Sequence, residues 1–188
     1  MDDLGGPDLH PLLATRWSPT TFDAAHELTG EQVDLLLEAA RWAPSAGNSQ
    51  PWAFVVGRRG DDTHRRLVPH LAASSARWAP TAGLLLANLS HRFVEGTDWE
   101  HSEFAHYDLG QAVAHLTVQA RAMDLHVRQF RAFSREGVAA AFGVPAHWEV
   151  TTMAAVGRVT APAAPLPPET RRERRPLDEL VWPSPEKA

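Results

Sequence analysis

Apolar residues in the first third of the chain recur at the spacing of a helix. They stand at positions i, i+3, i+4 and i+7 and therefore share one helix face: Val33, Leu36, Leu37 and Ala40. Thr29 stands before this run, and Gln32 stands three residues after Thr29, which is the spacing of a capping box. Pro44 cannot continue a helix because it lacks a backbone N–H. The pattern predicts an amphipathic helix that begins after Thr29 and ends before Pro44.

Four shorter stretches have the composition of strands, with apolar, aromatic or β-branched residues between turn signals. They comprise residues 51–57 (PWAFVVG), 83–89 (GLLLANL), 125–130 and 149–159. A polar helix is predicted over residues 61–73 and a loop over residues 93–103. Ser134 is the predicted cap of a further helix, which ends at Gly143. Strands interleaved with helices favour a layered α/β or α+β domain.

A long helix is predicted between a cap at Asp108 and a last residue near Met123. Its apolar positions hold helical spacing: Ala112, Val113, Leu116, Ala120 and Met123. Leu109 and Val118 widen this apolar stripe. A helix that is apolar over so much of its circumference is buried deeply or lies in an interface.

The chain has 188 residues, which suits one domain with a core of its own. We expect residues 1–15 to form a flexible N-terminal arm and residues 16–160 to form the folded domain. Residues 161–168 (APAAPLPP) are rich in proline and predict an extended conformation. We expect the tail, residues 161–188, to lie across a partner subunit.

Composition narrows the possible chemistry. The chain contains no cysteine, which excludes disulfides, thiolate metal sites, iron–sulfur clusters and a cysteine nucleophile. Its net charge of −5 gives no electrostatic reason to expect nucleic acid as a partner. The acidic N-terminus lacks the apolar region of a signal peptide, and the longest apolar stretch is too short to span a bilayer. We therefore expect a cytoplasmic protein without nucleic-acid or membrane partners.

Two parts of the sequence are candidates for binding a ligand. Residues 44–52 (PSAGNSQPW) offer small and amide-bearing residues that can contact a planar polar ligand or form an ordinary turn. Arg16 lies near one end of the chain, and Arg172 and Arg174 lie near the other. Their guanidinium groups can bind phosphate in bidentate geometry, or they can belong to a solvated basic run.

The remaining polar clusters fit surface groups better than a reaction centre. His101 and His106 are five residues apart, and hydrogen-bonded or exposed histidines are commoner than metal ligands at such spacing. The acidic residues 98, 100 and 103 are typical of a solvated loop. Nucleotide-binding glycine motifs and the G-x-S-x-G elbow are absent from the sequence. No metal site and no catalytic acid or base is predicted.

Five segments together resemble the nitroreductase family, in the order in which that family carries them. They are residues 16–22 (RWSPTTF), 39–56 (AARWAPSAGNSQPWAFVV), 107–125 (YDLGQAVAHLTVQARAMDL), 143–157 (GVPAHWEVTTMAAVG) and 175–180 (RPLDEL). The second segment is the most specific, and the matches span residues 16–181. The resemblance implies an α+β fold of three layers, with a mostly antiparallel central sheet between helices.

The resemblance also implies a homodimer that holds FMN at the interface between its subunits. The residues that it assigns to FMN are Arg16, Trp17, Ser18, Thr20, Pro44, Ser45, Asn48, Gln50, Gln129, Phe130, Arg131, Ala132, Arg172 and Arg174. Those near the chain ends would bind the phosphate and ribityl end. Residues 44–50 would approach the flavin from the partner subunit, and the backbone of residues 129–132 would face the ring.

Three positions depart from the family pattern. Thr20 replaces an arginine or lysine that commonly lies beside the flavin N1 and O2, and Ser75 replaces an asparagine that often contacts the flavin. The segment 129–132 lacks the usual glycine. A cation beside the ring would stabilise negative charge on reduced flavin, so its loss would lower the flavin potential or weaken binding. We hypothesise that Arg131 supplies the missing charge.

The resemblance implies an FMN-dependent oxidoreductase that passes electrons from NAD(P)H to a small organic acceptor, such as a nitroaromatic or a quinone, by a ping-pong mechanism. One alternative is a nitroreductase-like scaffold with weakened FMN binding, which would act as a ligand-binding or regulatory protein. A second alternative is a flavin oxidase or dehydrogenase that acts on a metabolite without nicotinamide. Thr20 and Ser75 motivate the scaffold alternative.

Overall fold

The computed structural model describes residues 9–159 and 174–182. Its centre is a four-stranded sheet in the order β1-β2-β4-β3, and every neighbouring pair is antiparallel. The strands are β1 (Trp52–Arg58), β2 (Leu84–His91), β3 (His126–Phe130) and β4 (Trp148–Gly157). The predicted α+β fold with a mostly antiparallel sheet is therefore confirmed.

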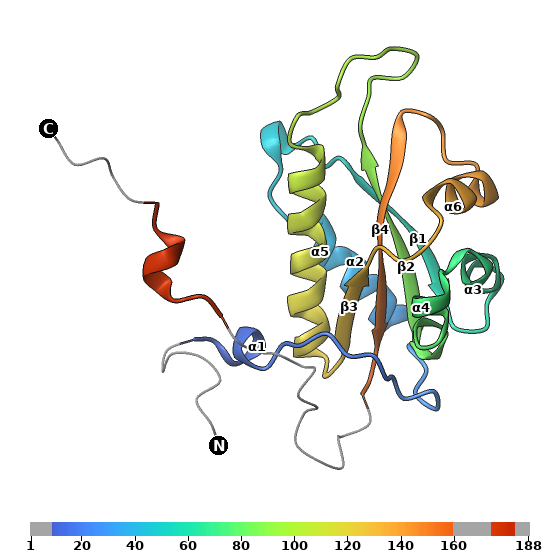
Figure 1. Cartoon of the computed structure of the whole chain (residues 1–188), viewed down its shortest axis with the longest axis vertical. Helices are drawn as coiled ribbons and strands as arrows, with labels where there is room; N and C mark the ends of the chain where they lie inside the picture. The colour runs from blue at the N-terminus through green and yellow to red at the C-terminus, as the bar shows by residue number, and fades with distance from the viewer. Residues whose placement is uncertain (1–8, 160–173, 183–188) are drawn as a thin grey trace, which may run out of the picture.

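Helices cover both faces of this sheet (Figure 1). On one face lie α2 (Gly30–Arg41) and α5 (Ala105–Ala122), and on the other lie α3 (Asp62–Leu67), α4 (Ala73–Ala76) and α6 (Arg135–Phe142). Alternate residues of β2 divide between the two cores, since Leu86 packs with α2 and α5 while Leu85 packs with α3 and α6. The layers are therefore helix, sheet and helix, as the family resemblance implies.

Local signals define several element ends as predicted. Thr29 and Gln32 form both bonds of the capping box of α2. The Ser134 hydroxyl accepts a hydrogen bond from the Gly137 N–H at 3.0 Å, and Gly143 ends α6 in the left-handed region with φ of 63°. Short-range hydrogen bonding is enough to specify these boundaries.

Two helix predictions differ from the structure. The predicted helix over residues 61–73 is broken into α3, a 3₁₀ turn η2 (Val68–His70) and α4, because Pro69 cannot donate to a continuing helix. The predicted cap at Asp108 is wrong by one turn, because α5 begins at Ala105 after Phe104. Asp108 is buried, and its carboxylate instead accepts a hydrogen bond from the Ala46 N–H at 3.0 Å.

The segments outside the sheet domain are only partly described. A short helix α1 (Pro11–Ala14) forms within the predicted N-terminal arm. Residues 160–173, which include the proline-rich stretch, lie outside the described residues. A 3₁₀ turn η4 (Leu177–Leu180) follows, and Figure 1 shows it apart from the sheet. Every described residue from 174 to 182 is exposed in the single chain.

Candidate functional site

Part of the predicted site gathers beside the second half of α5. A cavity of about 310 Å³ is lined by Arg16, Ser18 and Gln129 together with α5 residues that include Thr117 and Val118. Arg16 Nη1 donates a hydrogen bond to Ser18 Oγ at 3.3 Å. The segment that carries these residues reaches the sheet at Phe22, whose ring contacts the position that a side chain on Gly157 would fill. The structure therefore brings the N-terminal segment and β3 to one cavity.

Two side chains of β3 that were not predicted contact the N-terminal segment from the face of the strand opposite to Gln129. Arg128 Nη1 donates a hydrogen bond to the Ser18 carbonyl at 2.9 Å, and its guanidinium lies 5.1 Å from the centre of the Trp78 ring. His126 meets the edge of the Trp17 ring, with 5.4 Å between ring centres. The period-2 alternation of a strand puts His126 and Arg128 on one face, and that spacing could have identified them in the sequence.

A third unpredicted cation comes from the last turn of α5. Arg121 Nη1 lies 3.3 Å from His126 Nδ1 and donates to the Leu125 carbonyl at 3.2 Å. Arg121 Nη2 donates to Thr15 Oγ1 at 3.4 Å. Burial, with the charges of Arg121 and Arg16, lowers the pKa of His126 to about 4, so the imidazole is neutral at pH 7. Arg16, Arg121, His126 and Arg128 are called the cationic end below.

The charge of Arg121 is only weakly offset by the ion pair that it makes. Asp124 lies 3.9 Å from Arg121, but its side chain is 81% exposed, which makes the pair weak. The buried Nε atoms of Arg121 and Arg128 have no hydrogen-bond acceptor among the described residues. The spare Nε donors of Arg121 and Arg128 match the chemistry of an anionic ligand.

Of residues 129–132, Gln129 lines the cavity and the others make contacts elsewhere. Phe130 packs edge-on against Trp78, with 5.0 Å between ring centres. The Ala132 carbonyl accepts hydrogen bonds from the Ala72 N–H and from the buried Ser75 hydroxyl. Ser75 thus fastens the backbone of this segment. Its hydroxyl proton is shared between the Ala72 and Ala132 carbonyls.

The hypothesis that Arg131 supplies a charge to the ligand gains no support from these contacts. Arg131 is exposed; its Nη1 donates to the Phe133 carbonyl at 3.2 Å and its guanidinium lies over the Phe133 ring. Arg128 instead contacts the segment that carries Arg16 and Ser18. Thr20 is exposed and brings no charge of its own.

The predicted loop of residues 44–50 lies at the opposite end of α5. It is exposed, and its Asn48 and Gln50 adopt left-handed backbone angles, with φ of 55° and 48°. The Ser45 hydroxyl accepts from the Gln50 N–H at 3.0 Å, and Asp108 holds Ala46 from α5. Left-handed angles are unfavourable for side chains other than glycine, so these anchors maintain the shape of the loop.

One chain does not bring the two halves of the predicted site together. The loop contacts α5 at Asp108 and Gln111, whereas the α5 residues that line the cavity begin at Ala114, and none of residues 44–50 lines it. Arg174 is exposed and lies just before η4, while Arg172 lies outside the described residues. The predicted FMN residues therefore form two separate groups within the single chain.

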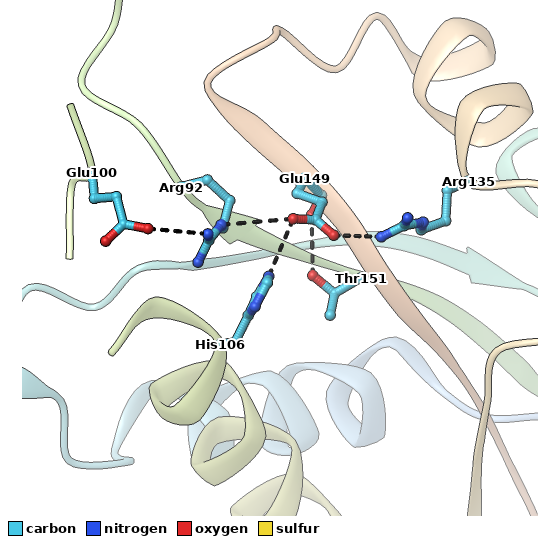
Figure 2. Close-up of polar contacts among 6 residues, drawn as sticks. All are labelled: Arg92, Glu100, His106, Arg135, Glu149 and Thr151. Carbon is cyan, nitrogen blue, oxygen red and sulfur yellow. Dashed lines mark hydrogen bonds and ion pairs between the residues drawn. The ribbon is translucent and has the colours of Figure 1, made fainter. Parts of the chain in front are cut away.

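A second polar cluster surrounds Glu149 at the first residues of α5 (Figure 2). The Glu149 carboxylate pairs with Arg135, with Arg92 Nε at 3.7 Å and with His106 Nε2 at 3.3 Å. Arg92 Nη2 also lies 3.3 Å from Glu100 Oε1. These five residues, called the Glu149 cluster, join the end of β2, the loop before α5, α5, α6 and β4. Its two arginines are paired with its two glutamates, so we expect the cluster to hold these elements together rather than to bind a ligand.

The remaining predicted surface groups have similar structural roles. The His101 ring stacks on the His91 ring with 3.8 Å between centres, and His91 stacks in turn on Trp148. Among residues 9–159 and 174–182, no group of three or more His, Cys, Asp or Glu side chains could hold a metal ion. Within the same residues, no helix is both long and apolar enough to cross a membrane.

Comparison with known proteins identifies the family. A family model described as the nitroreductase family matches residues 13–95. The 5,6-dimethylbenzimidazole synthase of Rhodospirillum rubrum is 33% identical over 149 residues, which cover 68% of this chain and 71% of that protein. Protein DrgA of Synechocystis sp. is 27% identical over 93% of this chain and 95% of that protein. A crystal structure of an oxidoreductase containing FMN superposes with a TM-score of 0.84 at 26% identity, over 97% of this chain and 95% of that chain. With its fold, its cavity and these relatives, the chain belongs to the nitroreductase family of oxidoreductases.

Proposed function

We propose that this protein binds FMN and uses it to pass electrons from NAD(P)H to a small organic acceptor such as a nitroaromatic or a quinone. The observation that carries the proposal is the cavity lined by Arg16, Ser18 and Gln129, with Arg128 bonded to the Ser18 carbonyl. The similar structure described as an oxidoreductase containing FMN supports the choice of ligand.

The side chains present fit a phosphorylated flavin. Arg16 would bind the phosphate, with Arg121 and Arg128 adding positive charge around it. Gln129 and the α5 residues that line the cavity would contact the less polar part of the ligand. When bound, FMN would supply the electron transfer that protein side chains cannot perform. The chain positions the ligand and sets its electrostatic surroundings.

We further propose that the working form is a homodimer, because within one chain none of the loop residues 44–50 lines the cavity. A second copy could place its own loop there. Two surfaces support association: Trp42 is 73% exposed, and an apolar groove of about 550 Å³ lies between α1, α2 and α5. The exposed residues 177–182 end in Trp182, which is 92% exposed and suited to a partner subunit.

The test is flavin binding to the purified protein. The protein should be yellow, or should become yellow and gain thermal stability when FMN is added, since a ligand at 100 times its Kd stabilises by about 2.7 kcal/mol. Arg16→Ala should weaken FMN binding about 10- to 100-fold, because charge-assisted hydrogen bonds contribute about 1.5–3 kcal/mol. Arg65→Ala, an exposed arginine of α3, is the matched control and should leave the affinity unchanged.

Two further measurements separate the alternatives. Anaerobic mixing with NADH and with NADPH should bleach the bound flavin, whereas a flavin enzyme that does not use nicotinamide would stay yellow. Sedimentation at micromolar concentration should show a dimer. A colourless protein that is indifferent to FMN would overturn the redox proposal and favour the alternative of a scaffold without flavin.

A further inference from the structure

The hairpin of residues 92–101 joins β2 to α5 and is attached to the domain at its base. The Val94 N–H donates to the Trp99 carbonyl at 2.8 Å and closes the hairpin, which extends beyond the end of the sheet (Figure 1). Every one of residues 94–100 is exposed, and a cavity of about 400 Å³ lies between the hairpin and residues 146–147. The hairpin buries little surface of its own, so contacts at its base determine its position.

Three stacked rings form one side of this base. His91 at the end of β2 is the cross-strand partner of Trp148 at the start of β4, and their rings stack with 4.7 Å between centres and 9° between planes. The ring of His101 stacks on the same His91 ring, with 3.8 Å between centres and 17° between planes. The Nε2 atoms of His91 and His101 are buried and have no hydrogen-bond partner among the described residues. The end of the hairpin is therefore held to β2 through the packing of two imidazoles.

The groups around the stack disfavour a charged ring at His91. Burial and the charges of His101 and His147 lower the pKa of His91, while a hydrogen bond with the Phe93 backbone acts in the opposite direction. The centre of the His147 ring lies 5.4 Å from that of His91. Both neighbouring glutamates already pair with Arg92 (Figure 2). The charged and titratable groups on the surrounding elements are Arg92 and Glu100 in the hairpin, His106 in α5, Arg135 in α6, His147 before β4 and Glu149 in β4.

The stack and the open hairpin differ in how many protons they can bind. Two imidazolium rings with centres 3.8 Å apart would repel each other, so the closed stack holds at most one charge. An open hairpin would expose both rings to water, where each binds a proton in acid. Opening therefore takes up at least one proton, and it becomes more favourable as pH falls.

We propose that the stacked pair of His91 and His101 is an acid-sensitive latch, which holds the 92–101 hairpin against β2 and β4 near neutral pH and releases it when pH falls. Release would open the cavity between the hairpin and residues 146–147 to solvent. The latch uses no part of the proposed FMN site, so the two proposals can be tested separately.

The proposal predicts a specific rise in hairpin opening. For one proton taken up, opening should become about 30-fold more favourable between about pH 7.5 and about pH 5, because a histidine with a pKa of about 6.5 is about 30 times more often charged than neutral at the lower pH. Hydrogen exchange of the full chain, followed by NMR and corrected for the intrinsic rate at each pH, measures this change. The amides to follow are those of Arg92, Val94 and His101, which are bonded within or beside the hairpin. Exchange that does not depend on low urea concentrations separates local opening from global unfolding.

A double variant removes the titration and keeps the packing. His91→Phe with His101→Phe preserves two stacked rings and eliminates two buried nitrogens without partners, so the fold should persist. Hairpin opening in this variant should stay constant within about threefold over the same pH range. His115→Phe changes an exposed histidine of α5 outside the stack and should keep the wild-type rise.

The ring signals of the wild type provide a second readout. Signals of the His91 and His101 rings should change over the pH range in which the hairpin amides lose protection. Constant opening in the wild type, an equal rise in the double variant, or two charged rings in a protected hairpin would overturn the latch. Because no flavin is present in these measurements, failure of the proposed function would be detected separately.

Discussion

The two ends of α5 carry polar clusters of opposite design. At its first turn, the Glu149 cluster places one carboxylate among Arg92, Arg135 and His106 (Figure 2). At its last turn, about 22 Å away, Arg121 meets a histidine, a hydroxyl and a carbonyl. The first cluster pairs its cations with carboxylates, whereas the ion pair of Arg121 in the second, with the exposed Asp124, is weak.

A structural ion network and a binding site differ in how their cations are paired. A cation paired with a carboxylate has its charge offset, and disturbing the pair costs stability. A cation held by neutral groups is fixed in position, but its charge remains available. The comparison predicts that mutations at the Glu149 cluster change stability, and that mutations at the cationic end change ligand affinity.

The largest expected effect is the loss of stability on replacing Glu149. Glu149→Gln removes the carboxylate shared by Arg92 and Arg135, and should lower the free energy of unfolding by about 2–3 kcal/mol. Urea denaturation measures this change. Glu103→Gln, an exposed acid in the loop before α5, is the matched control and should stay within about 0.5 kcal/mol of wild type. Equal stability of the two variants would contradict the structural role of the Glu149 cluster.

The next effect is the pH dependence that His126 contributes. Its pKa is about 4 in the folded protein, against 6.5 for an unperturbed histidine, so the unfolded chain binds the proton first as pH falls. This contribution to stability is fully present above about pH 6.5 and is lost towards about pH 4, by about 2 kcal/mol after allowance for partial exposure. Denaturation of wild type and His126→Gln across this range measures the difference. Parallel stability curves would show that His126 is protonated as easily in the folded protein as in the unfolded chain.

A smaller effect is expected on replacing Arg121. Arg121→Gln should weaken FMN binding about tenfold and leave riboflavin binding unchanged, because the charge acts on the phosphate. The same titrations with Arg65→Gln provide the control for loss of a surface arginine. Equal losses for FMN and riboflavin would mean that Arg121 shapes the cavity and does not recognise the phosphate.

The smallest expected effect concerns a neutral contact beside the cationic end. Ser75→Ala removes hydrogen bonds from the hydroxyl to the Ala72 and Ala132 carbonyls, and should destabilise the protein by about 1 kcal/mol. Ser74→Ala, at an exposed neighbouring position, should have no measurable effect. If Ser75→Ala left stability unchanged and abolished FMN binding, Ser75 would be a direct ligand contact and its assignment as a backbone anchor would be wrong.

The sequence itself determined the elements whose signals are local. The capping box at Thr29 and Gln32, the cap at Ser134 and the left-handed Gly143 each depend on residues within one turn, so their chemistry can be recognised without knowing the fold. The resemblance carried by residues 39–56 added the family and with it the layered architecture.

Only the tertiary structure decided which charges meet. Asp108 is a residue type that often caps helices. Its carboxylate instead accepts a hydrogen bond from the Ala46 N–H, which belongs to another part of the chain. Arg16, Arg121 and His126 come from three separate segments, and the packing of α5 against the N-terminal segment and β3 brings them together. Whether a charged side chain is neutralised depends on its neighbours in space, because electrostatic interactions act across distances that sequence separation does not measure.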